Sequence, residues 1–94
     1  MRTIERSSAF KRDYKRVKAT PRHAKDIDDL LTAVLSTLLV DEPLSVHHRD
    51  HELTGNWTGY RECHLKPDLL LIYRKPESET LRLARIGSHS ELFG

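Results

Sequence analysis

The feature that most constrains the fold of this chain is an apolar stripe with helical spacing in its first half. Six aliphatic residues recur at i, i+3, i+4, i+7, i+8 and i+11: Ile27, Leu30, Leu31, Val34, Leu35 and Leu38. Such a stripe lies on one side of a helix and must be buried against another element. The helix is expected to begin at Thr20-Pro21, where the threonine side chain can accept from free N–H groups. It should end before Pro43.

A shorter stripe precedes this helix. Phe10, Tyr14 and Val17 fall at i, i+4 and i+7, and Ser7-Ser8 can cap a helix that ends near Ala19. The opposite side of this helix, which we call the basic face, carries Lys11, Arg12, Lys15, Arg16 and Lys18. Two amphipathic helices joined this tightly predict a helical hairpin.

The rest of the chain has strand-like patterns. Strands are expected over residues 3–6, 57–64, 69–74 and 80–86. Residues 41–56 show no period and are expected to form a long loop, and residues 88–94 a short tail with a helical turn. The expected fold class is α+β, with the two-helix hairpin packed on a small, mainly antiparallel four-stranded sheet. The order is β-α-α-β-β-β, in one domain over residues 1–94.

Composition narrows the class of protein. The chain has 94 residues, of which 37% are hydrophobic and 32% charged, which fits one small globular core. Its longest apolar run, residues 69–73, is too short to span a membrane, and residues 1–6 are too polar to begin a signal peptide. Cys63 is the only cysteine, so no intrachain disulfide can form. We expect a cytoplasmic protein.

Charge is distributed unevenly along the chain. Residues 1–25 carry nine basic and two acidic side chains, a net charge of +7, whereas residues 26–45 carry five acidic and no basic ones. The basic face is either simply solvated or contacts phosphates. Its candidates for phosphate contact are Lys11, Arg12, Lys15 and Arg16. So positive a segment favours a polyanionic partner, because clustered cations release counterions on binding.

Histidines are the most informative reactive residues. They occur at positions 23, 47, 48, 51, 64 and 89. His64 ends one expected strand and Asp68 begins the next, so a tight turn would hold the two side chains close together. His23, which lies among basic residues, is expected to be solvated, and His47 and His48 receive no role.

The histidines, together with an arginine, are sufficient to cleave RNA without metal or cofactor. A base must remove the 2'-OH proton, an acid must protonate the leaving oxygen, and a cation must stabilise the charged phosphorane. Histidine can do both proton transfers near neutral pH. Arg61 and Arg85, on strands that lead to His64 and His89, suit phosphate oxygens. Phe93 can stack on an unpaired base or pack the tail against the sheet.

Structural alternatives remain for several of these residues. Asp68 can cap its own turn, and Arg61 can pair with Glu62, Glu52 or Asp50. A tetrahedral metal set is also conceivable, from His51, His64, His89 and Asp68. It lacks the close ligand pairs typical of zinc sites, so we expect acid–base catalysis with no metal and no cofactor.

An ordered series of motifs carries a family resemblance. The series begins with Asp50-His51-x-Leu53-x-Gly55-x-Trp57-x-Gly59-Tyr60-Arg61-x-x-His64. It continues with Pro67-Asp68, Ile72-Tyr73 and Arg85-x-Gly87-x-His89-x-x-Leu92-Phe93-Gly94. In this order and spacing the chain resembles the YafQ-type toxins of the RelE-like superfamily. Two differences stand out: Leu69 where relatives often have tryptophan, and Glu62 where they have aspartate.

The resemblance implies a helix pair on a small sheet and a type II toxin-antitoxin system. It implies a metal-independent endoribonuclease that cuts mRNA in the ribosomal A site, and a cognate antitoxin that neutralises it in a hetero-oligomeric complex. The acid–base positions of the family correspond to His51, His64, Asp68 and His89. Arg85 corresponds to its phosphate-stabilising residue and Phe93 to its C-terminal aromatic.

The division of labour that we expect gives His89 or Asp68 the role of acid or base. His51 and His64 would orient the RNA and the transferring proton. Two other functions compete with this one: a ParE-like gyrase poison, which shares the fold but lacks a catalytic cluster, and a non-catalytic nucleic-acid-binding module.

Overall fold

A computed structural model describes all 94 residues of the chain, Met1–Gly94. Strands and helices follow the order β1 (Thr3–Arg6), α1 (Ser8–Ala19), α2 (Pro21–Ala24), α3 (Ile27–Leu39), η1 (Val46–His48), β2 (His51–Glu52), η2 (Gly55–Trp57), β3 (Arg61–Lys66), β4 (Leu69–Arg74), β5 (Thr80–Gly87) and α4 (His89–Phe93). The η elements are short 3-10 helices. None of the helices combines the length and the apolar character needed to cross a membrane.

The strands form one sheet in the order β1-β5-β4-β3-β2, in which β1 runs parallel to β5 and all other pairs are antiparallel. The α+β class and the mainly antiparallel sheet are therefore confirmed, and β3, β4 and β5 form an antiparallel meander. The strand count was wrong, because the expected loop contains β2, a two-residue strand paired with β3. A strand this short has no periodicity that a sequence could reveal.

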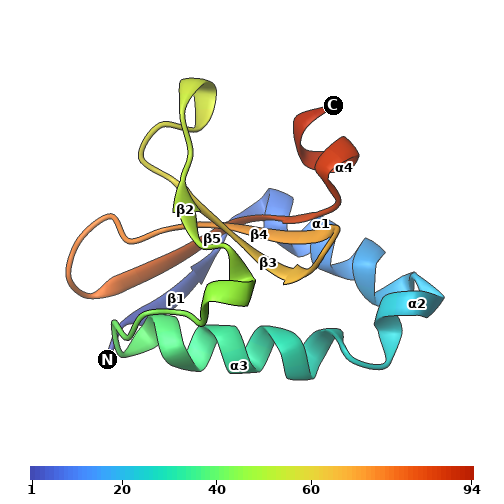
Figure 1. The fold of residues 1–94 in the computed structure, drawn as a ribbon, viewed down its shortest axis with the longest axis horizontal. Helices are drawn as coiled ribbons and strands as arrows, with labels where there is room; N and C mark the ends of the chain where they lie inside the picture. Colours follow the sequence, from blue (N-terminus) through green and yellow to red (C-terminus); the bar gives the residue numbers. More distant parts are fainter.

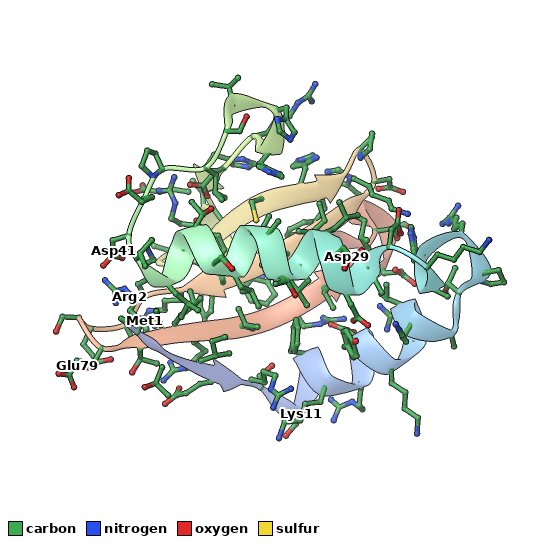
Figure 2. The ribbon with its side chains drawn as sticks, turned by 90° about the horizontal axis from the view of Figure 1, so that it is seen from below. Met1, Arg2, Lys11, Asp29, Asp41 and Glu79 are labelled. Carbon is green, nitrogen blue, oxygen red and sulfur yellow. The ribbon has the colours of Figure 1, made fainter.

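Helices α1 and α3 cover one side of the sheet (Figures 1 and 2). The apolar stripe of α3 is buried there through Ile27, Leu31, Val34 and Leu38. Phe10 and Val17 of α1 belong to the same core, together with alternate residues of the sheet. Ser7 caps α1, since its side chain accepts a hydrogen bond from the backbone N–H of Phe10.

The second helix does not run unbroken from Pro21, as its stripe led us to expect. A side chain from β3 interrupts it: the Lys66 ammonium donates to the carbonyl of Arg22 at 2.8 Å. The backbone N–H of Asp26 then bonds to the His23 carbonyl, so α2 ends at Ala24 and α3 begins at Ile27, with two residues between them. The expected cap at Thr20 was also wrong, because its hydroxyl donates back to the Arg16 carbonyl.

The first strand of the meander is shorter than its sequence pattern indicated. Residues 55–57 form η2, and Gly59 has a positive φ of 94°, so regular pairing starts only at Arg61. Leu53, Trp57 and Tyr60 pack instead on a second apolar cluster, made by Leu70, Ile72, Ala84 and Leu92. Figure 1 shows the η2 loop and α4 rising from the same side of the sheet, opposite α3.

Candidate active site

The strand register gathers polar side chains on the side of the sheet that faces away from α3. His51 of β2 pairs with Glu62 of β3, and His64 pairs with Leu70 of β4. Cys63, between them, points to the helix-covered core. Because side chains alternate along a strand, Glu62 and His64 share the opposite face with His51.

Glu62 lies at the centre of this group. Its side chain is only 5% exposed, and its carboxylate lies 3.4 Å from Nε2 of His64, 3.7 Å from Nε2 of His51 and 3.9 Å from Nε2 of His89. A carboxylate this buried needs positive or hydrogen-bonding partners, and three imidazoles surround it. The sequence allows Glu62 a surface pairing with Arg61 and places it where relatives have aspartate. Its alternation with Cys63 was the signal that placed it beside the histidines.

His89 is held by Asp68. The turn was expected to bring Asp68 close to His64, but the hydrogen-bond partner of the Asp68 carboxylate is His89. Oδ1 of Asp68 lies 3.0 Å from the ring Nδ1 and accepts the backbone N–H of His89 at 3.0 Å. The backbone hydrogen bond, and then the ring hydrogen bond, hold the pKa of Asp68 below its ordinary value. An ionised carboxylate can only accept, so Nδ1 carries the proton and Nε2 faces Glu62 with its lone pair free in the neutral ring.

His51 is fixed in the same way from the other side. Its Nδ1 lies 2.7 Å from the carbonyl oxygen of Arg49, which can only accept a hydrogen bond. Its Nε2 is therefore free to exchange a proton. His51 and His89 are half-exposed, at 51% and 55%, whereas His64 is 11% exposed. The two accessible imidazoles thus flank Glu62, with the more buried one between them.

Helix α4 owes its position to several contacts. Ser88 and Glu91 form a capping box, Arg16 of α1 binds the Glu91 carboxylate at 3.0 Å, and Leu92 is buried in the second apolar cluster. A Cβ on Gly87 would lie 2.9 Å from Glu91 Oε1 and 3.0 Å from Arg16 Nη2, so a larger residue there would displace these two side chains. Because His89 is the first residue of α4, these contacts also place His89 in the site.

Phe93 follows one turn after His89. Its ring is 44% exposed, and its centroid lies 6.4 Å from that of the His89 ring. The residue therefore borders the cluster with an accessible aromatic surface, as its expected role requires. Leu69, by contrast, is buried in the helix-covered core and presents nothing to this side.

Arg85 is paired in register with Ile72 and so starts on the side of the candidate site. Its guanidinium binds Asp13 of α1 through Nε at 2.5 Å and Nη2 at 3.1 Å. Burial acts to raise the pKa of Asp13, but hydrogen bonds from Arg85 and Arg16 and from the backbone N–H of Ile86 outweigh it and lower the pKa. Arg85 is therefore a rigidly held cation, and two of its guanidinium nitrogens, Nε and Nη2, already donate to Asp13.

Arg61 is not brought to this site. It pairs with Tyr73, which belongs to the helix-covered core, so both side chains start on the far side of the sheet. Its guanidinium binds Asp50 at 3.3 Å and Glu52 at 3.6 Å. Arg61 therefore pairs with surface carboxylates, which was the alternative to substrate binding. The geometry of the site gives no support to a role of Arg61 in binding the substrate.

The basic face is divided in its contacts. Lys11, Arg12 and Lys15 are exposed and have no carboxylate partner, whereas Arg16 is engaged with Asp13 and Glu91.

The expectation that His23 is solvated was wrong. His23 is 8% exposed, its Nδ1 lies 3.1 Å from Lys66, and burial lowers its pKa.

The donor set of the site also fits a transition metal. One ligand atom from each of Glu62, His64 and His89 lies within 4.8 Å of the others. Imidazole and carboxylate groups are suitable ligands for zinc or copper. This set differs from the one considered from the sequence, since Glu62 takes the place of Asp68 and His51 is not included. The same atoms can instead transfer protons, as Nε2 of both exposed histidines is free.

Comparison with known proteins identifies relatives over the whole length of the chain. Residues 2–94 match the family described as "Bacterial toxin of type II toxin-antitoxin system, YafQ". The mRNA interferase toxin YafQ of Escherichia coli K12 is 40% identical over 95 residues, covering 99% of this chain and 97% of the relative.

Solved structures agree with this match. A metal-bound toxin from Helicobacter pylori has a TM-score of 0.85 at 46% identity, over 99% of this chain and 100% of that one. The E. coli DinJ-YafQ complex contains a chain with a TM-score of 0.82 at 39% identity, over 100% of both chains.

Proposed function

The chain belongs to the YafQ family of bacterial toxins of type II toxin-antitoxin systems, and we propose that it is itself an mRNA interferase. It is an endoribonuclease that cuts mRNA on the ribosome by acid–base chemistry and so stops translation in the cytoplasm. The family match, the mRNA interferase activity named for the E. coli relative, and the geometry of the three histidines support this function.

The observation that carries the proposal is the placement of two exposed imidazoles on either side of a buried carboxylate. His51 and His89 each donate through Nδ1 to a fixed oxygen and direct Nε2 toward Glu62. Two groups are needed to cleave a phosphodiester at its ribose hydroxyl, one to accept a proton and one to donate it. In our proposal these are His51 and His89.

The reaction is a transesterification. Neutral Nε2 of one histidine removes the proton of the 2'-OH, the 2'-oxygen forms a bond to phosphorus, and the bond from phosphorus to the 5'-oxygen breaks. The protonated Nε2 of the other histidine gives its proton to that leaving oxygen. The products are a cyclic phosphate and a free 5'-hydroxyl, and no water is consumed. These steps use only side chains of this chain, and we propose that they require no metal.

The remaining side chains support the two histidines. Asp68 is a positioning residue, because it holds the tautomer and the ring of His89. Glu62 offers a negative charge to the imidazolium that forms on proton abstraction, and His64 lies against it at 3.4 Å. Arg85 is the proposed cation for the phosphorane, and Phe93 the proposed stacking surface for a base beside the cut.

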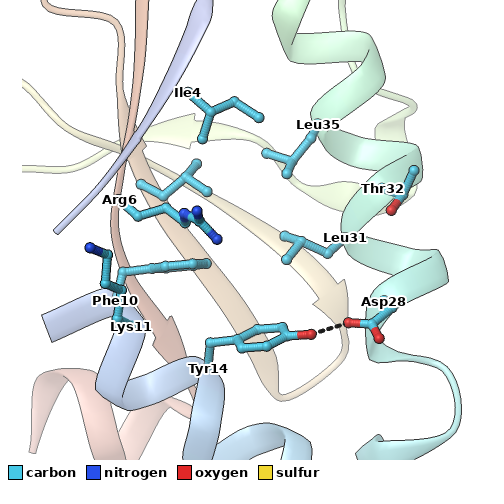
Figure 3. A pocket seen from close by; sticks show the side chains of 10 residues that line it. Ile4, Arg6, Phe10, Lys11, Tyr14, Asp28, Leu31, Thr32 and Leu35 are labelled. Carbon is cyan, nitrogen blue, oxygen red and sulfur yellow. Dashed lines mark hydrogen bonds between the residues drawn. The ribbon is translucent and has the colours of Figure 1, made fainter. Parts of the chain in front are cut away.

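A cognate antitoxin is the second proposed partner, as in the E. coli DinJ-YafQ complex. Beside the basic face lies a groove of about 550 Å³ between β1, α1 and α3 (Figure 3). Ile4, Phe10, Leu31 and Leu35 give it an apolar floor, and Arg6 and Lys11 border it. An acidic segment with apolar side chains fits both properties, because its charge complements the rim. The complex would be hetero-oligomeric.

The decisive experiment maps the 5' ends of mRNA on translating ribosomes after the purified chain is added. Wild type should create new 5' ends within the bound mRNA, with a 5'-hydroxyl, and His89→Gln should create far fewer while unfolding at the same temperature. Intact mRNA in stalled ribosomes would support a binding module instead. Gyrase trapped on DNA, with mRNA left intact, would support the ParE-like alternative.

A further inference from the structure

Half of the ten arginines of this chain have no carboxylate partner. Five bind carboxylates: Arg2, Arg16, Arg61, Arg82 and Arg85. The other five are Arg6, Arg12, Arg22, Arg49 and Arg74, of which Arg74 lies over the ring of Tyr60. Two of the unpaired arginines each line a pocket that also contains a residue of the proposed active site. They are Arg49, beside His64, and Arg22, beside Asp68.

The pocket at Arg49 is a polar concavity of about 310 Å³ next to His64. It is lined by His47, Arg49, His64, Leu65, Lys66 and Pro67, and no carboxylate is among them. The Lys66 ammonium is turned away to Asp26 and the Arg22 carbonyl. The guanidinium of Arg49 is therefore the one permanent charge in this pocket that no anion of the protein neutralises.

The backbone holds Arg49 firmly at this place. Its φ of 49° and ψ of 42° lie in the left-handed region, which is unfavourable for a residue with a Cβ. Its N–H bonds to the carbonyl of Val46, and its own carbonyl accepts the Nδ1–H of His51. His48 ties the preceding turn to β3 through the His64 carbonyl, at 2.8 Å. The two proposed site residues on β2 and β3 thus fix the segment that carries Arg49.

The pocket at Arg22 lies on the other side of the β3–β4 turn. It measures about 220 Å³, has no apolar lining residue, and is formed by Arg22, His23, Lys66, Pro67 and Asp68. Lys66 holds α2 in place by donating to the Arg22 carbonyl, so Arg22 is fixed relative to Asp68. Lys66 and Pro67 belong to both pockets and form the wall between them.

We propose that Arg49 and Arg22 bind the phosphates on the two sides of the scissile one, so that the mRNA strand crosses the turn at Lys66-Pro67. This inference rests on the proposed function and specifies how the substrate lies in the site. A single RNA strand carries one phosphate charge per nucleotide, and a guanidinium binds two phosphate oxygens at once. The two pockets offer two guanidinium groups without a carboxylate salt bridge, next to His64 and Asp68 of the proposed active site.

The test removes the contact between an arginine and a phosphate in two ways, once by changing the RNA and once by changing the protein. Short mRNAs carry one methylphosphonate, which is neutral, at the phosphate just before or just after the cut site, and are bound to ribosomes. Cleavage rates are compared for wild type, Arg49→Ala and Arg22→Ala. Loss of a charge-assisted contact should slow wild type by about tenfold for each neutral phosphate. In each variant, the neutral phosphate at the position that the missing arginine would contact should not lower the cleavage rate any further.

Arg74→Ala is the matched control, because it removes one unpaired arginine at the other end of β4. It should keep the rate and the phosphate sensitivity of wild type, and thermal unfolding should show that all variants are folded. If Arg49→Ala and Arg22→Ala remain as sensitive as wild type to both neutral phosphates, the inference is wrong although the chain cuts mRNA. If wild type leaves unmodified mRNA intact, the proposed function itself is wrong.

Discussion

Asp68 accepts two hydrogen bonds from His89 on the same carboxylate oxygen, one from the ring and one from the backbone, both at 3.0 Å. The pair joins the β3–β4 turn to the first residue of α4, 21 positions later in the chain. This contact therefore helps to hold α4 in place, and it sets the orientation of the imidazole and the nitrogen that carries its proton.

Asp68→Asn should lower the rate of mRNA cleavage by about 10- to 100-fold, the range typical of a lost orienting partner. The amide can donate to Nδ1 and so favours the wrong tautomer. Because its two hydrogen bonds lower the pKa of Asp68, the carboxylate stays ionised down to pH values below the ordinary range near 4. The variant should therefore be slower than wild type throughout pH 5 to 8, because Asp68 is ionised over this whole range. A variant that matches the wild-type rate within this range would contradict the positioning role.

Zinc or copper ions should inhibit cleavage, because they would occupy the Nε2 atoms that the reaction needs. Glu62, His64 and His89 offer three donor atoms within 4.8 Å. Calorimetry should detect binding to wild type, and Glu62→Gln should weaken it by at least about tenfold, as expected for a lost ligand. Addition of a chelator selective for zinc and copper, which leaves the Mg²⁺ of the ribosomes in place, should leave the cleavage rate unchanged. A rate that falls with this chelator and returns with zinc or copper would overturn the metal-independent mechanism.

Asp13→Ala should destabilise the fold by about 3–5 kcal/mol, because it leaves the partly buried Arg85 guanidinium without its partner. The pKa of Asp13 is lower in the folded than in the unfolded chain, so its stabilising effect is full above the ordinary aspartate pKa near 4. That effect is lost as the pH falls through the lowered pKa. Urea unfolding should show the gap between wild type and variant narrowing only below about pH 4. A gap that persists unchanged at lower pH would contradict this origin.

Gly87→Ala should clearly lower the rate of mRNA cleavage but lower the free energy of unfolding only slightly. The added Cβ would meet Glu91 Oε1 at 2.9 Å and Arg16 Nη2 at 3.0 Å, and both are ends of flexible side chains. They can move aside, at a cost of about 1 kcal/mol, but the capping box and the Arg16–Glu91 pair would then loosen and α4 would shift. Cleavage assays and thermal unfolding on the same samples decide this. Full activity in a folded variant would show that α4 tolerates the shift.

Replacing Lys11, Arg12 and Lys15 by alanine should weaken binding of the cognate antitoxin by about tenfold or more at low salt, and by less as salt rises. None of these side chains has a carboxylate partner in the protein, so the change removes charge and leaves the fold intact. Calorimetry with the antitoxin at two salt concentrations measures the effect. Equal affinities of variant and wild type would place the antitoxin elsewhere on the surface.

Periodic patterns predicted the local elements well. The apolar stripes located α1 and most of α3, and the continuous apolar run gave β4 its observed bounds, Leu69–Arg74. Irregular segments escaped this reasoning. The two residues of β2 have no period, and the break between α2 and α3 depends on Lys66, which lies 44 positions after Arg22. Long-range side-chain contacts of this kind leave no trace in a local pattern.

Patterns in the sequence were enough to predict the class of fold, the two amphipathic helices and the histidines and Asp68 that a toxin of this family would use. The tertiary structure was needed to show which of those residues meet. It placed Glu62 among three imidazoles, bound Arg85 to Asp13 across 72 positions, and turned Arg61 to the other side of the sheet. The reason is physical: helix and strand periods act between near neighbours, whereas a buried charge takes its partner from whichever strand or helix packs against it.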